Sequence, residues 1–224
     1  MIAPIAPGHL KINEIFFSVQ GEGSRAGAPC VFVRLHGCGL RCVWCDTPYA
    51  LDHQDGGIWM SFHEIRRAID RHPTRFIEFT GGEPLEQPEA HRLMQDLADD
   101  GWTVAVETGG HVDISTCDAR VIRIVDFKAP GSGMMKRNRL ENVSLLNEKD
   151  EVKFVCASIK DYEWSRDFIN AYQITARVAC TFISAAFGRI EPLELVRHIL
   201  DDGLDVRFQL QLHKFLWNPE TRGV

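Results

Sequence analysis

The sequence predicts an α/β fold, an incomplete (β/α) barrel of the TIM-like kind, and three observations support this. Short apolar runs alternate with segments of helical periodicity, which is typical of parallel strands joined by right-handed crossovers. About seven such runs can be recognised, too few for a closed barrel of eight strands. With 224 residues, 45% hydrophobic and 25% charged, the chain has the size and composition of one globular domain.

Each predicted strand is a short apolar run that can hold an isolated charged residue. In order along the chain, the predicted strands are 31–35, 75–80, 103–107, 121–126, 151–156, 176–183 and 206–212.

The predicted helices lie between these strands. Ser61 and Glu64 have the spacing of a capping box, which predicts a helix that begins at Phe62. Apolar residues recur every three or four positions over 90–98, and Gly101 follows as a helix stop. Further helices are predicted over 162–172 and 192–200.

Two segments interrupt the alternation. Residues 51–57 form a polar insertion that ends in glycine, and residues 130–148 begin with Pro-Gly-Ser-Gly where a regular helix is due. In α/β folds, ligands gather where the strands end. Both segments follow predicted strands, so we expect lid or binding loops there, and one shortened helix.

Seven cysteines are present, an uneven number. A secreted disulfide framework usually has an even number and a leader peptide, whereas residues 1–9 lack the basic segment of a signal peptide. We therefore expect a cytoplasmic protein, in which Cys30, Cys156 and Cys180, each in or beside an apolar run, are buried. No apolar run approaches the ~20 residues of a membrane helix. The net charge of −6 disfavours nonspecific nucleic-acid binding.

Three of the cysteines, Cys38, Cys42 and Cys45, lie within one short segment. Their spacing lets one loop wrap a metal centre with each thiolate turned inward. A zinc site fits, with His36 or His53 as the fourth ligand. A 4Fe–4S cluster also fits, and with three protein ligands it leaves one iron open for a small molecule. The spacing favours the cluster.

A second motif, Thr80-Gly81-Gly82-Glu83-Pro84, closes the predicted strand 75–80. Paired glycines let a ligand approach the backbone closely, and the Glu83 carboxylate suits an ammonium group. A lone Gly-Gly is more often a plain turn, but its position at a strand end favours a binding site.

The two motifs together, with Trp44 before the last cysteine, resemble the radical S-adenosylmethionine (SAM) superfamily. Within this superfamily, the chain is similar to the 7-carboxy-7-deazaguanine synthase family. The similar segments are 14–23, which contains Gln-Gly-Glu-Gly, and 32–38, Cys45-Asp46-Thr47, 126–133 and 209–214. The family often has Ser-Pro-Lys where this chain has Asp126-Phe127-Lys128. The resemblance extends over the whole chain.

The resemblance implies a radical SAM lyase. In this family a 4Fe–4S cluster donates an electron to bound SAM, which yields a 5′-deoxyadenosyl radical. The radical takes hydrogen from C6 of 6-carboxy-5,6,7,8-tetrahydropterin, the ring contracts, ammonia leaves and SAM is re-formed. The product, 7-carboxy-7-deazaguanine, leads to queuosine in tRNA. The cofactor carries this chemistry, so no side chain is expected to act as acid or base.

Partners and domain organisation also follow from the resemblance. It implies a homodimer, a small-molecule pterin substrate and an external electron donor such as flavodoxin or ferredoxin, without direct nucleic-acid or membrane contact. It implies a single radical SAM domain over residues 1–224, in which segment 10–30 forms part of the substrate site and residues 213–224 form a tail.

The resemblance assigns roles residue by residue. Cys38, Cys42 and Cys45 would hold the cluster, and Thr47 would ligate Mg²⁺. SAM contacts are implied for Trp44, Cys45, Asp46, Gly82, Glu83 and Lys128. Substrate contacts are implied for Val19, Gln20, Gly21, Glu22, Arg34, Thr80 and His213.

Two alternative hypotheses remain at this point. A glycyl-radical activating enzyme would share the cluster and SAM but act on a protein, and the Gln-Gly-Glu-Gly segment disfavours it. A zinc-stabilised binding module would carry no chemistry, and the iron content of anaerobically purified protein distinguishes it.

Overall fold

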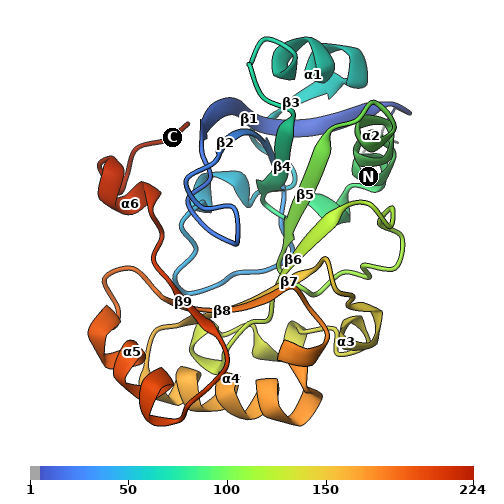
Figure 1. Cartoon of the computed structure of the whole chain (residues 1–224). Helices are drawn as coiled ribbons and strands as arrows, with labels where there is room; N and C mark the ends of the chain where they lie inside the picture. Colours follow the sequence, from blue (N-terminus) through green and yellow to red (C-terminus); the bar gives the residue numbers. More distant parts are fainter. Residues whose placement is uncertain (1–5) are drawn as a thin grey trace.

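The computed structural model describes residues 6–224 (Figure 1). The expectation about a leader peptide over residues 1–9 falls in part on residues 1–5, which lie outside the described residues. Across the described residues, no helix is both long and apolar enough to span a membrane.

The described residues form one sheet of nine strands in the order β3-β1-β2-β4-β5-β6-β7-β8-β9. Their bounds are β1 (His9–Val19), β2 (Pro29–Leu35), β3 (Ile58–Ser61), β4 (Phe76–Gly81), β5 (Thr103–Thr108), β6 (Ile122–Asp126), β7 (Glu151–Cys156), β8 (Cys180–Ala185) and β9 (Arg207–Gln209).

The parallel part of the sheet consists of β2 and β4 to β9, and these are the seven strands that the sequence predicts. The strands β1 and β3 pair antiparallel at one edge and were not among those predicted. Since β3 and β9 are the two free edges, the sheet is open. The incomplete barrel is therefore confirmed.

The helices also match the prediction in outline. They are α1 (Phe62–Ile69), α2 (Pro88–Asp99), α3 (Asn142–Leu145), α4 (Ile159–Tyr172), α5 (Pro192–Asp201) and α6 (His213–Leu216), with short 3-10 turns η1 (Pro48–Ala50), η2 (Pro84–Glu86), η3 (Pro130–Ser132), η4 (Met135–Arg137) and η5 (Ile174–Ala176). The capping box of Ser61 and Glu64 is present. Residues 130–148 hold only η3, η4 and the four-residue α3, which confirms the shortened helix.

Two details of the prediction were wrong. The strand predicted from residue 176 begins at Cys180, because Ile174–Ala176 forms a 3-10 turn instead. Cys180 is half-exposed at the start of β8, whereas Cys30 and Cys156 are buried as expected.

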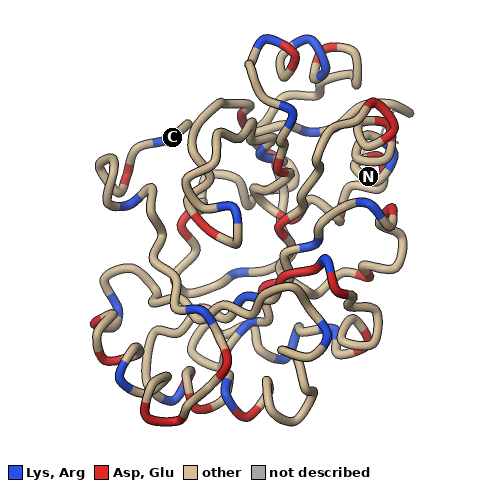
Figure 2. The backbone as a smooth tube through the Cα atoms, viewed as in Figure 1, with Lys and Arg blue, Asp and Glu red and all other residues tan. Residues whose placement is uncertain are grey.

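The core explains the position of the functional site. Apolar residues of the strands and of α1, α2, α4 and α5 form one large buried cluster, which includes Ile65, Leu93, Phe154 and Ile199. Successive strand residues point to opposite faces, so the strands turn a second set of side chains away from this cluster. Those side chains are often charged, and Figure 2 shows charged positions along the strands as well as on the outer helices.

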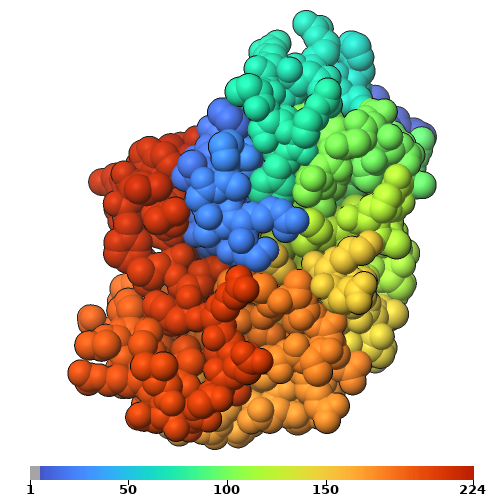
Figure 3. Space-filling model, viewed as in Figure 1, coloured from blue at the N-terminus to red at the C-terminus, as the bar shows by residue number. Residues whose placement is uncertain are grey.

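The last part of the chain packs against residues 20–23 and 49 beside the open edge of the sheet. The Leu212 N–H donates to the Gly21 carbonyl at 3.0 Å, and the Arg222 guanidinium lies 3.8 Å from the centre of the Tyr49 ring. Figure 3 shows the C-terminal residues packed against the N-terminal segment. We call the contacts of residues 209–213 with residues 20–23 the seam.

Candidate active site

A cavity of about 560 Å³ lies where the parallel strands end. All the residues to which the sequence assigned a role line it: Val19, Gln20, Gly21, Glu22, Arg34, Cys38, Cys42, Trp44, Cys45, Asp46, Thr47, Thr80, Gly82, Glu83, Lys128 and His213. Residues from the first and last parts of the sequence thus face one space.

The cysteine loop, residues 38–45, forms one wall of this cavity. Cys38 is buried, Cys42 and Cys45 are half-exposed, and all three thiols are free. The loop is held by its own atoms and by the segment after β6. The Arg41 guanidinium donates to the Cys38 carbonyl at 2.5 Å, and the Val43 N–H donates to the Ser132 carbonyl at 3.1 Å.

Two of these thiols, Cys38 and Cys42, have raised pKa values in the absence of a metal. Burial raises the pKa of Cys38 to about 12. Burial also raises the pKa of Cys42, although the nearby Lys128 opposes this. Metal ligands bind as thiolates, and a metal supplies the positive charge that stabilises them. The cavity wall is therefore suited to three thiolates around a cationic centre.

The two histidines proposed as a fourth zinc ligand are engaged elsewhere. His36 Nδ1 lies 3.0 Å from Asn13 Nδ2, and its Nε2 lies 2.7 Å from the Asp55 carbonyl. His53 Nε2 faces Glu86 at 3.4 Å. Within residues 6–224, no three His, Cys, Asp or Glu side chains converge as ligands of one ion. Three free thiols in one cavity wall are the donor set of a 4Fe–4S cluster that has three protein ligands.

The Gly-Gly-Glu-Pro segment forms the wall next to Cys38. A side chain at Gly82 would collide with the Gly37 carbonyl oxygen, so the close approach of the two loops requires glycine there. Glu83 is 1% exposed, and its carboxylate accepts from the Leu85 and Gly109 N–H groups at 3.1 and 2.8 Å. Burial raises the pKa of this carboxyl group. The motif ties β4 to β5 and presents Glu83 at the cavity.

On the opposite side, the Gln-Gly-Glu-Gly segment packs against the C-terminal part of the chain. The Glu22 carboxylate accepts from Gln209 at 3.0 Å, Gln211 at 2.9 Å and Lys153 at 2.8 Å. A side chain at Gly21 would collide with the His213 ring. The seam therefore brings His213 to the wall that the sequence assigned to substrate.

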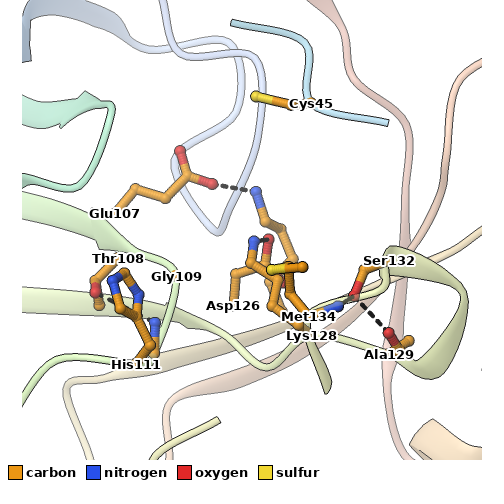
Figure 4. Close-up of polar contacts among 12 residues, drawn as sticks. Cys45, Glu107, Thr108, Gly109, His111, Asp126, Lys128, Ala129, Ser132 and Met134 are labelled. Carbon is orange, nitrogen blue, oxygen red and sulfur yellow. Dashed lines mark hydrogen bonds and ion pairs between the residues drawn. The ribbon is translucent and has the colours of Figure 1, made fainter. Parts of the chain in front are cut away.

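The remaining predicted residues have partners inside the chain. Arg34 Nε donates to Glu14 at 2.7 Å, which leaves the rest of its guanidinium for the cavity. Thr47 is the N-cap of η1, but its hydroxyl makes no capping hydrogen bond. Figure 4 shows Lys128 next to Asp126, whose carboxylate lies 2.7 Å from the ammonium group. Burial acts to lower the pKa of Lys128, but the charges of Asp126 and Cys42 outweigh it and raise that pKa.

Among the charged residues of the cavity that the sequence reasoning missed are Glu78, Glu107 and Lys153. Lys153 is ion-paired with both Glu107 and Glu22, and Glu78 accepts from Gln20. Burial acts to raise the pKa of Glu107, but Lys153 outweighs it and lowers that pKa. Burial, and then the charge of Glu107, raise the pKa of Glu78. The sequence contains a signal for these three residues, because each is a charged residue within an otherwise apolar predicted strand.

These features define a class before any relative is considered: an open (β/α) barrel with a three-thiol loop and a Gly-Gly-Glu-Pro segment at its mouth. A sequence model of the Radical SAM superfamily matches residues 32–127. A crystal structure of QueE from Escherichia coli has the same fold, with a TM-score of 0.69 and 23% identity over 92% of this chain and 95% of that one.

Relatives named 7-carboxy-7-deazaguanine synthase narrow the class. The Chlorobaculum tepidum protein is 44% identical over 96% of this chain and 97% of its own length. The Koribacter versatilis protein is 39% identical over 96% of this chain and 100% of its own length. The Clostridium acetobutylicum protein is 36% identical over 96% of this chain and 99% of its own length. The chain belongs to the 7-carboxy-7-deazaguanine synthase family of radical SAM enzymes. The resemblance stated from the motifs is therefore confirmed, and it implies a 4Fe–4S cluster and SAM.

Proposed function

We propose that the chain is a radical SAM lyase that converts 6-carboxy-5,6,7,8-tetrahydropterin to 7-carboxy-7-deazaguanine with loss of ammonia, on the route to queuosine. One observation carries this proposal: the thiols, the Gly-Gly-Glu-Pro segment and the Gln-Gly-Glu-Gly segment all line one cavity. A cofactor and a small planar substrate can therefore lie against each other there.

Cys38, Cys42 and Cys45 would hold the cluster, which supplies the electron that generates a radical from SAM when both are bound. Gly82, with no side chain, lets the SAM amino group approach the backbone, and Glu83 accepts hydrogen bonds from it. Trp44, Asp46 and Lys128 complete the SAM contacts. The buried positions of Glu83 and Cys38 keep water away from the reactive atoms.

The substrate would lie between the seam and the strand ends. Gln20 offers a donor and an acceptor for a pterin edge, and the Val19 and Gly21 backbones add further hydrogen bonds. Glu22, Thr80 and His213 close this wall, and Arg34 can bind the substrate carboxylate in a fork-like geometry.

Mg²⁺ would bind at Thr47 together with substrate oxygens and water, because Mg²⁺ prefers oxygen ligands. The Thr47 hydroxyl is free of a capping bond, which supports its use as a ligand.

We further propose one radical SAM domain over residues 1–224, with segment 10–30 in the substrate site and 213–224 as its tail. A flavodoxin or ferredoxin would supply electrons to the cluster, and the active form would be a homodimer. The seven cysteines are all free, which suits the reducing cytoplasm.

The test is an anaerobic assay of the reconstituted protein with 6-carboxytetrahydropterin, SAM, Mg²⁺ and a reductant. We expect the deazapurine product and roughly four irons per chain, the content of one 4Fe–4S cluster. The Cys42→Ala variant is expected to lose both, whereas Cys180→Ala, a change at β8 away from the cavity, keeps both. An iron-loaded protein that cleaves SAM but forms no deazapurine would contradict the proposed substrate.

A further inference from the structure

Behind the cysteine loop lies a group of charged side chains that does not line the cavity. It consists of Glu86, from η2, and His111, which follows β5. Glu86 Oε1 accepts from the Gly39 N–H at 2.9 Å and lies 2.7 Å from His111 Nε2. The His111 side chain is 4% exposed. Gly39 directly follows Cys38, so this pair contacts the cysteine loop from outside the cavity.

These contacts are part of a closed ring around Cys38. On one side, the Glu83 N–H donates to the Gly37 carbonyl at 2.8 Å. On the other side, Gly39 is bound to Glu86. The ring is completed by His111 Nδ1, which lies 3.5 Å from Glu83 Oε2. Figure 4 shows His111 beside Gly109, whose N–H donates to the same Glu83 carboxylate. Of the two backbone neighbours of Cys38, Gly37 is thus fixed to the Gly-Gly-Glu-Pro segment and Gly39 to the η2 turn that follows it.

The fit at Gly39 is tight. A Cβ added at Gly39 would lie 2.5 Å from Glu86 Oε1, so any side chain there displaces the carboxylate. The second oxygen of Glu86 and the Nδ1 atom of His111 are buried and make no hydrogen bond among residues 6–224, and they have only longer contacts, with His53 Nε2 at 3.4 Å and with Glu83 Oε2 at 3.5 Å. Buried polar atoms without partners are costly and rare, and here they lie together. Their proximity indicates that the position of the pair is held for a purpose other than stability.

We propose that Glu86 and His111 are positioning residues that fix the orientation of Cys38 towards bound SAM. This inference rests on the proposed function, because it assumes that Cys38 is a cluster ligand. Glu86 holds the Gly39 N–H, and His111 holds Glu86 against the segment that carries Glu83. Release of this N–H lets the Cys38 backbone move away from Gly82 and Glu83, where SAM is bound.

The first test uses the apoprotein, so that it does not depend on activity. Amide hydrogen exchange of residues 38–42 is measured in wild type, Glu86→Leu, Glu86→Gln and Glu163→Leu. Glu86→Leu is expected to exchange roughly tenfold faster, the scale of one lost charge-assisted hydrogen bond. Glu86→Gln keeps a carbonyl acceptor for Gly39 and is expected to remain within roughly threefold of wild type. Glu163 is exposed on α4, so Glu163→Leu is the matched control.

The second test uses the reconstituted enzyme. Glu86→Leu is expected to raise the KM for SAM roughly tenfold, more than it lowers kcat, and to weaken the change that SAM causes in the electron paramagnetic resonance spectrum of the reduced cluster. Gly39→Ala displaces Glu86 without removing a charge. Gly39→Ala is expected to raise the KM for SAM in the same way as Glu86→Leu. If Glu86→Leu does not fold, Gly39→Ala tests the proposal in its place.

Wild-type exchange and a wild-type KM for SAM in both Glu86→Leu and Gly39→Ala would overturn the proposal. An equal defect in Glu86→Gln would also overturn it, because the charge and not the hydrogen bond would then matter. A wild-type protein that binds no SAM would contradict the proposed function instead, and the exchange rates of the apoprotein would still decide the role of Glu86.

Discussion

Where the strands reach the cavity, Lys153 lies among the carboxylates of Glu22, Glu78 and Glu107. Lys153 is ion-paired with Glu22 and Glu107, while Glu78 contacts Gln20. Burial acts to lower the pKa of Lys153, but the negative charges of Glu107 and Glu22 outweigh it and raise that pKa well above its usual value. Because burial and the charge of Glu107 raise the pKa of Glu78, whereas the pKa of Glu107 is lowered, Glu78 is protonated before Glu107 when the pH falls.

The Glu78→Gln variant tests this assignment. In the unfolded chain Glu78 loses its proton near pH 4.5, and in the folded chain only at a higher pH. Between these two values unfolding releases a proton, so rising pH favours the unfolded state. An amide has no proton to release there. The free energy of unfolding of Glu78→Gln, minus that of wild type, is therefore expected to increase as the pH rises from 4.5 towards the higher pKa of Glu78 in the folded chain.

This difference is measured by urea unfolding of the apoprotein at a series of pH values. Glu163→Gln, a change of the same kind at an exposed position of α4, is expected to show no trend. If Glu78→Gln also gives a difference that does not change with pH, Glu78 is ionised in the folded protein and the assignment is wrong.

The residues that bear motifs could be predicted from the sequence, and the charge network could not. Cys38, Gly82 and Gln20 stand in short patterns whose spacing indicates their chemistry. Glu107 and Lys153 are single charges in separate strands, 46 residues apart in sequence. Their pairing depends on the parallel order β5-β6-β7, which no local pattern contains.

Among the elements, α1 shows how a local signal defines a boundary. The Ser61 hydroxyl accepts from the Glu64 N–H at 3.3 Å, and Glu64 accepts from the Ser61 N–H at 2.8 Å. These bonds satisfy backbone donors that a helix start leaves free. The helix then buries Ile65 and Ile69 in the core. Because all these interactions are local, the sequence predicts the start of α1 correctly.

Ser61→Ala is expected to lower the free energy of unfolding by about 1 kcal/mol, the usual effect of losing an N-cap side chain. Urea unfolding of the apoprotein measures it, and the KM for SAM is expected not to change. Ser144→Ala is the control, because Ser144 donates to Glu141 within α3 and caps no helix start. An equal loss in both variants would contradict a capping role for Ser61.

The strands β1 and β3 show where local reasoning fails. β3 is a four-residue edge strand in which Ile58 and Trp59 are exposed, so it lacks the alternation that marks a half-buried strand. β1 has an irregular register between Ile12 and Glu14, which interrupts its period of two. Both strands are fixed by pairing across the sheet, β1 with β2 and β3 with β1.

At the scale of the whole molecule, the seam joins residues 20–23 to residues 209–213, beyond the hydrogen-bonded strands of the open sheet. Besides the Leu212 bond to Gly21, the Gly23 N–H donates to Gln209 at 2.5 Å, and Gln211 donates to Glu22 at 2.9 Å. These contacts place the last part of the chain over the wall that we assign to the pterin. The geometry of the substrate site therefore depends on both ends of the chain.

Gly21→Ala tests this dependence. The added Cβ would collide with the His213 ring, so the C-terminal segment must move outward. We expect kcat/KM for the pterin to fall by roughly 10²-fold, as for other misplacements near a reaction centre. The KM for SAM is expected to change much less, because Gly82 and Glu83 belong to the segment after β4, and the seam reaches the proposed SAM contacts through the 3.4 Å contact of Gln211 with Asp46. The steady-state assay with each substrate varied in turn measures both.

The matched variant is Gly21→Ala combined with His213→Ala, which removes the colliding ring. If collision is the cause, adding Gly21→Ala to His213→Ala costs much less than adding it to wild type. A full additional loss in the double variant would show that Gly21 matters through its own backbone and not through the seam.

The seam differs from the contacts within the sheet. It is held mostly by side-chain hydrogen bonds, whereas the strands of the sheet are held by ladders of backbone hydrogen bonds. Opening it breaks a few bonds at Glu22 and Gln209, which costs far less than unfolding the barrel. A ligand held by Glu22 and His213 stabilises the closed form by its own binding energy. A ligand that contacts both sides of the seam leaves more easily when the seam is open, so its affinity and its residence time are coupled. The open sheet thus allows the entrance of the cavity to be controlled by its occupant.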